Sequence, residues 1–216
     1  MLKFGDLINR LRHNRGFGVQ SPSDFHFVTQ VLGERLPYYA YKEINSIAAS
    51  CKRHSAKHCR MLFRITNYFA PKSIIVAGSG QGATLCAMAA ARPSAEIAAT
   101  DTQNLATPAK EMLQAHHCLQ HTSEEQLPHI IENSKHPLLV YVGDTESCEA
   151  IIEAAIEHAQ NDTVIIVDDI HRTPAKLQSW SKAAANAKAT ITYDMYSAGL
   201  LLFDNKRYKQ HYTLKK

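Results

Sequence analysis

Two patterns of apolar residues divide the chain near residue 70. In residues 1–70, apolar side chains recur every three or four positions, which is the spacing of amphipathic helices. We expect helices there around residues 4–11, 23–32 and 43–69. In residues 71–216, short apolar runs alternate with helical segments instead. The patterns therefore predict an N-terminal helical extension, residues 1–70, and a main domain, residues 71–216.

The main domain alternates predicted strands and helices. Strands are predicted at residues 73–77, 96–100, 118–121, 138–142 and 164–167, the third of them weakly. Helices are predicted at residues 82–92, 108–115, 124–133, 148–160 and 174–187. Continuous apolar strands are typical of a parallel sheet that helices cover on both faces. We therefore expect an α/β fold with three layers, built around a doubly wound sheet.

The end of the domain departs from this alternation. Thr190–Met195 and Leu200–Phe203 are both predicted strands, and only four residues separate them. Four residues suffice for a hairpin, whereas a parallel crossover needs about a dozen or more. The sheet should therefore end in an antiparallel hairpin, which is how class I methyltransferases end and ordinary dinucleotide-binding dehydrogenases do not.

A glycine-rich turn follows the first predicted strand of the main domain. Gly78, Ser79, Gly80 and Gly82 lie between that strand and a helix, where a backbone can approach a ligand closely. The string fits a methyltransferase loop, and with Ala83 it also fits the loose dinucleotide fingerprint. Asp101 follows about 20 residues on, where the ribose of either cofactor would find a carboxylate. The loop alone leaves S-adenosylmethionine and NAD open.

Acidic residues also follow the next two strands. Asp144 comes just after residues 138–142, and Asp168 and Asp169 follow residues 164–167, with His171 close behind. Ligands of open α/β sheets bind beyond the carboxyl ends of the strands. We place Asp144 and Asp168 at the cofactor, and we assign Asp169 or His171 to orient or deprotonate the acceptor.

Charge is distributed unevenly along the chain. Residues 1–72 carry 12 basic against 4 acidic residues, residues 73–204 carry 7 against 16, and the last twelve carry 5 against none. Either the basic segments lie over the acidic domain or they attract an anionic partner, and nucleic acid is not excluded. Five scattered cysteines, with neither a membrane-spanning stretch nor a signal peptide, predict a reduced protein of the cytoplasm.

A further string, Cys51, His54, His58 and Cys59, contains residue types that bind zinc. On one continuous helix, Cys51, His54 and His58 would share a face. Lysines and arginines surround them, however, and no second ligand pair follows. We therefore interpret the string as a solvated basic helix face and predict no metal there.

The chain as a whole resembles the small class I methyltransferases related to catechol-type O-methyltransferases, in residues 74–84, Asp101 and residues 164–172. A closer likeness is to uncharacterised methyltransferase-like proteins of Bacteroidetes, whose G-V-H-S-P-F segment is matched by residues 18–23. The resemblance implies S-adenosylmethionine at the glycine loop, a substrate near Asp169 and His171, and a lid formed by residues 18–21. It favours O-methylation of a small molecule, and a homodimer is an open alternative to a closing lid.

Two positions depart from the family pattern. Val76 stands where relatives carry an acid, and Gly143 stands where metal-dependent relatives carry a metal-binding aspartate. We therefore doubt a divalent metal. Both departures also motivate a second hypothesis, a catalytically degenerate binding protein with the same fold, and the loose fingerprint keeps an NAD-dependent oxidoreductase as a third.

Overall fold

The structure is a computed structural model that describes residues 19, 21–116 and 119–214. Its strands are β1 Ser73–Ala77, β2 Glu96–Ala99, β3 Leu119–His121, β4 Leu138–Val142, β5 Thr163–Asp168, β6 Ile191–Asp194, β7 Ala198–Leu202 and β8 Gln210–Thr213. The α-helices are α2 Pro22–His26, α3 Tyr41–Cys51, α4 Ala56–Phe69, α5 Ala83–Ala91, α6 Thr107–Gln114, α7 Leu127–Glu132, α8 Cys148–Glu157 and α9 Pro174–Ala185. Short helical turns complete the set: η2 Phe27–Leu32, η3 Thr102–Asn104 and η4 Glu124–Gln126.

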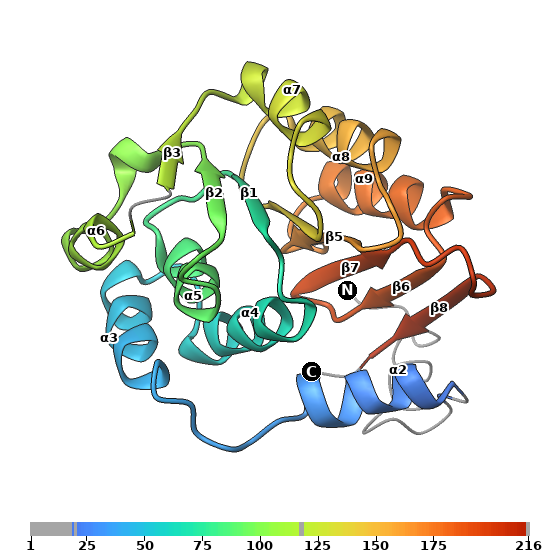
Figure 1. The fold of residues 1–216 in the computed structure, drawn as a ribbon, viewed down its shortest axis with the longest axis horizontal. Helices are drawn as coiled ribbons and strands as arrows, with labels where there is room; N and C mark the ends of the chain where they lie inside the picture. The colour runs from blue at the N-terminus through green and yellow to red at the C-terminus, as the bar shows by residue number, and fades with distance from the viewer. Residues whose placement is uncertain (1–18, 20, 117–118, 215–216) are drawn as a thin grey trace.

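One mixed sheet runs through the molecule in the order β3-β2-β1-β4-β5-β7-β6-β8 (Figure 1). Strands β1 to β5 pair in parallel, and β7 is antiparallel to both β5 and β6. The expected α/β sheet with a C-terminal antiparallel hairpin is therefore confirmed. The classic dinucleotide-binding sheet has the order 3-2-1-4-5-6 and lacks the inserted antiparallel strand, so this topology separates the two folds.

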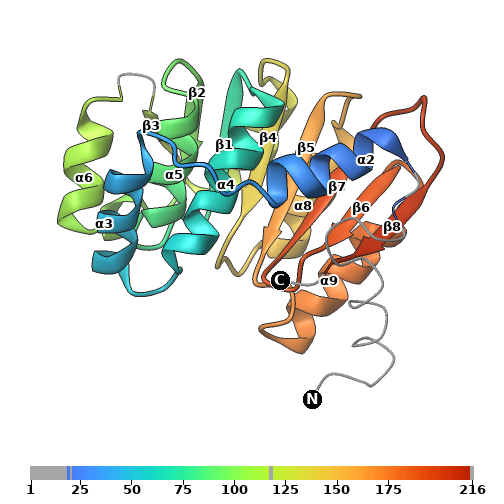
Figure 2. The same cartoon turned by 90° about the horizontal axis from the view of Figure 1, so that it is seen from below.

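Helices cover both faces of the sheet, as the continuous apolar strands predicted. Alternate residues of each strand point to opposite faces, so β1 sends Ile74 and Val76 one way and Ile75 and Ala77 the other. Helices α3, α4 and α5 bury their apolar faces against the first set, and α7, α8 and α9 against the second (Figures 1 and 2). The helices α3 and α4, which precede residue 70, thus cover one face of the sheet. The division of the chain into two domains at residue 70 stays a prediction.

The predicted helix over residues 43–69 is two helices. The first ends at Cys51, because Lys52 adopts a left-handed backbone with φ 55°, and α4 begins after Ser55, whose side chain caps it by accepting from the His58 amide. The expected solvated basic face is only partly right, because Lys52, Arg53 and Lys57 are exposed whereas Cys51, His58 and Cys59 are buried.

Two more sequence expectations differ from the structure or lie outside it. Strand β8 in the basic tail was not predicted, and it pairs in parallel with β6, so the Leu200–Phe203 region is not the last strand. The helix expected around residues 4–11 lies outside the described residues. Within the described part of the chain, no helix is both long and apolar enough to cross a membrane.

A buried carboxylate joins the N-terminal segment to the C-terminal strands. Asp24, on α2, is 1% exposed and accepts hydrogen bonds from the hydroxyls of Tyr193 at 2.5 Å and Tyr212 at 3.0 Å. Arg207 donates to the same carboxylate. Because α2 is fixed to β6 and β8 in this way, it lies at the β8 end of the sheet (Figure 2).

Candidate functional site

The glycine loop joins β1 to α5 and is tied to the end of β2. The Gly78 amide donates to Thr100 Oγ1 at 2.8 Å, and the buried Ser79 hydroxyl donates to the Thr100 carbonyl. Ser79 therefore holds the loop in place with its hydroxyl, and only its backbone remains to face a ligand. Gly78, Gly80 and Gly82 all have positive φ, a conformation that favours glycine.

The three glycines differ in what surrounds them. A Cβ on Gly78 would lie 2.5 Å from the Asp144 carbonyl oxygen, and one on Gly82 would lie 2.7 Å from Leu105 Cδ2. A Cβ on Gly80 would meet nothing within 4 Å. Gly78 and Gly82 are therefore required by the packing of this protein, whereas Gly80 borders open space at the carboxyl end of β1.

Asp101 stands beyond the end of β2 in a left-handed conformation, with φ 58°. None of the described residues donates a hydrogen bond to its carboxylate. Partial burial, together with the nearby carboxylates of Glu124 and Asp144, raises the pKa of Asp101. That Asp101 accepts from the hydroxyls of a ribose stays a prediction of the sequence.

Asp144 is brought close to the glycine loop but its carboxylate is already engaged. Arg53 donates to its Oδ2 at 2.7 Å and Arg172 at 3.0 Å. The hydrogen bond from Arg53 is the main reason that the pKa of Asp144 is lowered. The Asp144 carboxylate therefore binds two arginines, and the backbone of Asp144 rather than its side chain contacts the glycine loop.

The structure explains why residue 143 carries no carboxylate. A Cβ on Gly143 would lie 2.4 Å from the Gly78 carbonyl oxygen and 3.1 Å from Tyr141 Cε1. The carbonyl of Gly143 accepts from the buried Lys176 ammonium at 2.7 Å. With this backbone, an aspartate at position 143 does not fit, so the residues present do not match the carboxylate metal site of the metal-dependent relatives.

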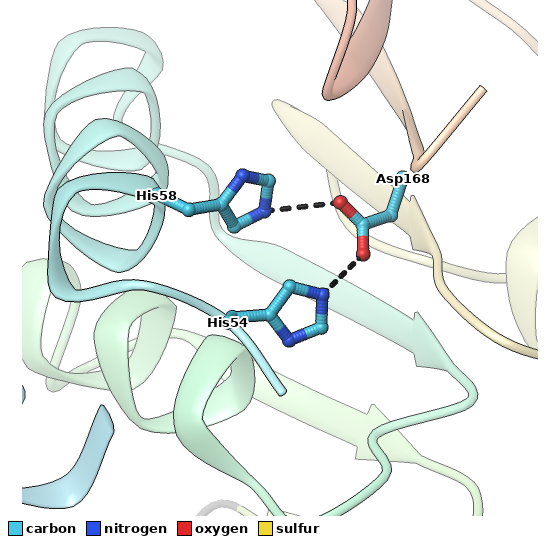
Figure 3. Close-up of side chains that lie close together, drawn as sticks. All are labelled: His54, His58 and Asp168. Carbon is cyan, nitrogen blue, oxygen red and sulfur yellow. Dashed lines mark hydrogen bonds and ion pairs between the residues drawn. The ribbon is translucent and has the colours of Figure 1, made fainter. Parts of the chain in front are cut away.

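Asp168 ends β5 and faces the α3–α4 side of the sheet. Its carboxylate is 0% exposed and lies 2.6 Å from His54 Nε2 and 3.0 Å from His58 Nε2 (Figure 3). Burial raises the pKa of the Asp168 carboxyl, but the hydrogen bond from His54 and the contact with His58 outweigh it and hold the pKa well below its usual range. The sequence placed Asp168 at the cofactor, whereas its nearest side chains are these two histidines.

Asp169 and His171 lie in the turn after β5. Asp169 adopts φ 48°, and its amide donates to the Ser197 carbonyl at 2.7 Å. His171 stacks on Tyr196 with the ring centroids 4.8 Å apart, and its Nε2 lies 3.1 Å from Asp194 Oδ2. An imidazole held by a carboxylate is the arrangement of an oriented general base.

Three of these side chains were missed by the sequence reasoning. Asp194 lies in β6, where nothing marks it as a partner of His171. His54 and His58 were visible in the Cys-His string, but their shared partner is 114 residues away from His54. Cys51 does not join them, because its thiol donates to the Gln81 carbonyl.

Two of the four residues of the predicted lid lie outside the residues that the structure describes. Residues 18 and 20 are outside the described residues, and Ser21 caps α2 and accepts a hydrogen bond from Arg207. This end of the segment is therefore fixed near β8, away from the glycine loop, and a closing role for residues 18–21 stays a prediction.

No protein-family profile matches the chain, and no curated protein matches it in sequence. Solved structures do match it. The O-methyltransferase TomG from Streptomyces achromogenes, involved in tomaymycin synthesis and solved with SAM, has a TM-score of 0.58 at 16% identity, covering 84% of this chain and 95% of that one. The methyltransferase PaMTH1 from Podospora anserina, bound to SAH, has a TM-score of 0.59 at 11% identity, covering 88% and 97%.

A third match is the O-methyltransferase from Bacillus cereus in complex with SAH, with a TM-score of 0.56 at 12% identity, covering 83% of this chain and 96% of that one. Identities this low show a shared fold. The fold is the one of the class I methyltransferases, as the antiparallel hairpin predicted.

Proposed function

We propose that the protein is an S-adenosylmethionine-dependent methyltransferase that methylates an oxygen atom of a small molecule. The observation that carries the proposal is the space beside Gly80, at the carboxyl end of β1, where a cofactor of this fold class would bind. The fold and the carboxylate of Asp101 support it independently.

Different residues of the chain would contact different parts of the cofactor. The loop from Gly78 to Gly82 would hold the cofactor through its backbone and the start of α5, and Asp101 would accept hydrogen bonds from the ribose hydroxyls. When bound, S-adenosylmethionine supplies an electrophilic methyl group. The protein's part is then to place the acceptor oxygen in line with it, and such positioning accounts for much of the acceleration of reactions of this kind.

His171 is the residue we assign to the proton of the acceptor hydroxyl. His171 would take the proton, and the Asp194 carboxylate, 3.1 Å from His171 Nε2, would stabilise the resulting imidazolium. Asp169 precedes it by two residues and would orient the acceptor. Both assignments are the ones that the sequence suggested, and Asp194 is added by the structure.

The test is methyl transfer itself. A panel of small phenols, catechols and alcohols is incubated with the protein and S-adenosylmethionine, and S-adenosylhomocysteine is measured. Turnover should fall in His171→Ala while the affinity for the cofactor stays within about twofold, and His129→Ala, on exposed α7, should behave like the wild type. Loss of cofactor binding in His171→Ala would contradict the assignment.

Four further properties remain proposals. The protein acts in the cytoplasm, an interpretation supported by four free, buried cysteines: Cys51, Cys59, Cys86 and Cys148. The likeness to Bacteroidetes proteins through residues 18–23 stays a prediction. A homodimer and a nucleic-acid partner also stay open, and salt-sensitive binding to RNA or DNA would be the sign of the second.

A further inference from the structure

Two histidines and an aspartate converge in the described part of the chain, outside the residues assigned above to the reaction. His54 lies in the turn before α4, His58 in its first turn, and Asp168 at the end of β5 (Figure 3). One ligand-type atom of each, the two imidazole nitrogens and a carboxylate oxygen, lies within 4.8 Å of the other two. The cluster therefore brings together three atoms that could share one ligand.

These atoms are buried and incompletely bonded. The His58 side chain is 4% exposed and the Asp168 side chain 0%. His58 Nε2 and Asp168 Oδ1 lie 3.0 Å apart, yet neither makes a well-aligned hydrogen bond with any described residue. The buried Tyr141 hydroxyl lies near the same carboxylate and near Thr84. Buried polar atoms are rarely left without a well-aligned partner, so His58 Nε2 and Asp168 Oδ1 point to a group that binds between them.

The charge of the cluster also favours a bound group. A fully buried carboxylate is costly unless a positive charge accompanies it. The guanidinium of Arg53 is bonded to Asp144. Neutral imidazoles bring no charge, so a cation held between them and the carboxylate would supply a positive charge directly.

The ligand set fits a particular class of cation. Imidazole nitrogen with carboxylate oxygen suits zinc and similar first-row divalent ions, whereas calcium and magnesium prefer oxygen alone. Tetrahedral bonds of about 2.0–2.1 Å place neighbouring ligand atoms roughly 3.3 Å apart. The observed separations are 2.6 Å from His54 Nε2 to Asp168 Oδ2 and 3.0 Å from His58 Nε2 to Asp168 Oδ1. Both are shorter than that value, so the imidazoles and the carboxylate would move apart to admit the ion.

The neighbouring thiols do not belong to the set. Cys51 donates to the Gln81 carbonyl, and among the described residues the ligand atoms that converge here are those of His54, His58 and Asp168. The site is therefore His-His-Asp, with a further coordination position for water or another small oxygen ligand.

We propose that His54, His58 and Asp168 bind one zinc-class divalent transition metal ion. This ligand set is distinct from the aspartate expected at position 143, and the ion would link α4 to the end of β5. The proposal does not depend on methyl transfer, because it concerns atoms that converge without the cofactor.

The experiment uses the full chain without a polyhistidine tag, stripped with a chelator and dialysed. Zn²⁺ is titrated by calorimetry against a competing chelator, and Co²⁺ is added separately to record its visible d–d absorption. We expect one equivalent to bind, a cobalt spectrum of low coordination number, and a higher melting temperature with Zn²⁺. No cofactor is present, so the outcome is separate from that of the methyltransferase assay.

Variants locate the ion. His54→Gln and His58→Ala should each weaken Zn²⁺ binding at least tenfold, because losing even an outer partner of a ligand costs about 10–100-fold. His129→Ala, an exposed histidine on α7, should leave the affinity unchanged. His54 lies in the turn before α4 and its side chain is 12% exposed, against 4% for His58, so His54→Gln keeps the test valid even if His58→Ala fails to fold.

Two results would overturn the proposal. One is a wild-type protein that melts cooperatively but binds no stoichiometric Zn²⁺, which would leave the cluster as an ion pair of histidine and aspartate. The other is binding that stays within about twofold of the wild type in His54→Gln, which would place the ion on other histidines.

Discussion

Replacing Gly78 and Gly80 separately by alanine would distinguish a packing glycine from a ligand-facing one. Both have positive φ, +71° and +54°, and both lie in one loop, so the added methyl group is the same in each. Only the surroundings differ: the Cβ at position 78 would lie 2.5 Å from a backbone oxygen of Asp144, and the one at position 80 would meet nothing within 4 Å.

The free energy of unfolding should separate the two variants. An alanine in the left-handed region costs about 1–2 kcal/mol, so Gly80→Ala should lose that much. Gly78→Ala should lose a further 1–3 kcal/mol or so, because the β4–α8 backbone has to move, a cost typical of overpacking. Urea unfolding followed by circular dichroism measures both values.

The affinity for S-adenosylmethionine should show the reverse order, with the larger loss in Gly80→Ala. In Gly80→Ala the methyl group enters the space reserved for the ligand, and a misfit of about 1–3 kcal/mol corresponds to a loss of roughly 5–150-fold. A Gly80→Ala protein that binds the cofactor as tightly as the wild type would refute the proposal that the ligand binds beside Gly80. A Gly78→Ala protein no less stable than Gly80→Ala would refute the packing argument.

Three further results are expected. Asp24→Ala should lose about 3–5 kcal/mol of unfolding free energy in urea, because it leaves Arg207 and two tyrosine hydroxyls without their shared buried carboxylate; a loss below about 1 kcal/mol would contradict this. Burial and Asp24 raise the pKa of Tyr212 to about 12, so its contribution to stability is full below its unfolded value near 10 and is lost as the pH rises toward 12. Urea midpoints should therefore fall over that range, and Tyr212→Phe should fall less steeply. The lowered pKa of Asp168 predicts the opposite pH dependence. The contribution of this carboxylate to the free energy of unfolding is present above about pH 4 and is lost on acidification. The urea midpoint of Asp168→Asn should therefore fall less steeply than that of the wild type as the pH is lowered.

Most of the strands were predictable because they carry a strong local signal. Buried parallel strands are continuous apolar runs, and the four residues between β6 and β7 force a hairpin. Strand β8 carries no such signal, since Gln210–Thr213 is a short, polar edge strand in which Tyr212 is the buried residue. Its pairing with β6 depends on a tertiary contact rather than on its own composition.

The site was only partly predictable for a related reason. The glycine loop and Asp101 are local motifs with known spacing, so the sequence alone could propose them as cofactor-binding residues. The break at Lys52 was not visible, because a left-handed lysine has no glycine or proline to mark it. That break turns His54 toward Asp168, and a contact between residues 114 positions apart follows from the fold alone.

Calorimetric titration of the purified protein with S-adenosylmethionine tests the central claim most directly, with S-adenosylhomocysteine and NADH as comparison ligands. The account predicts one saturable site for both methionine-derived ligands, with affinity in the micromolar range common for such small molecules, and no heat with NADH. A cooperatively folded protein that binds neither of the two would contradict the methyltransferase function and support the degenerate binding protein instead.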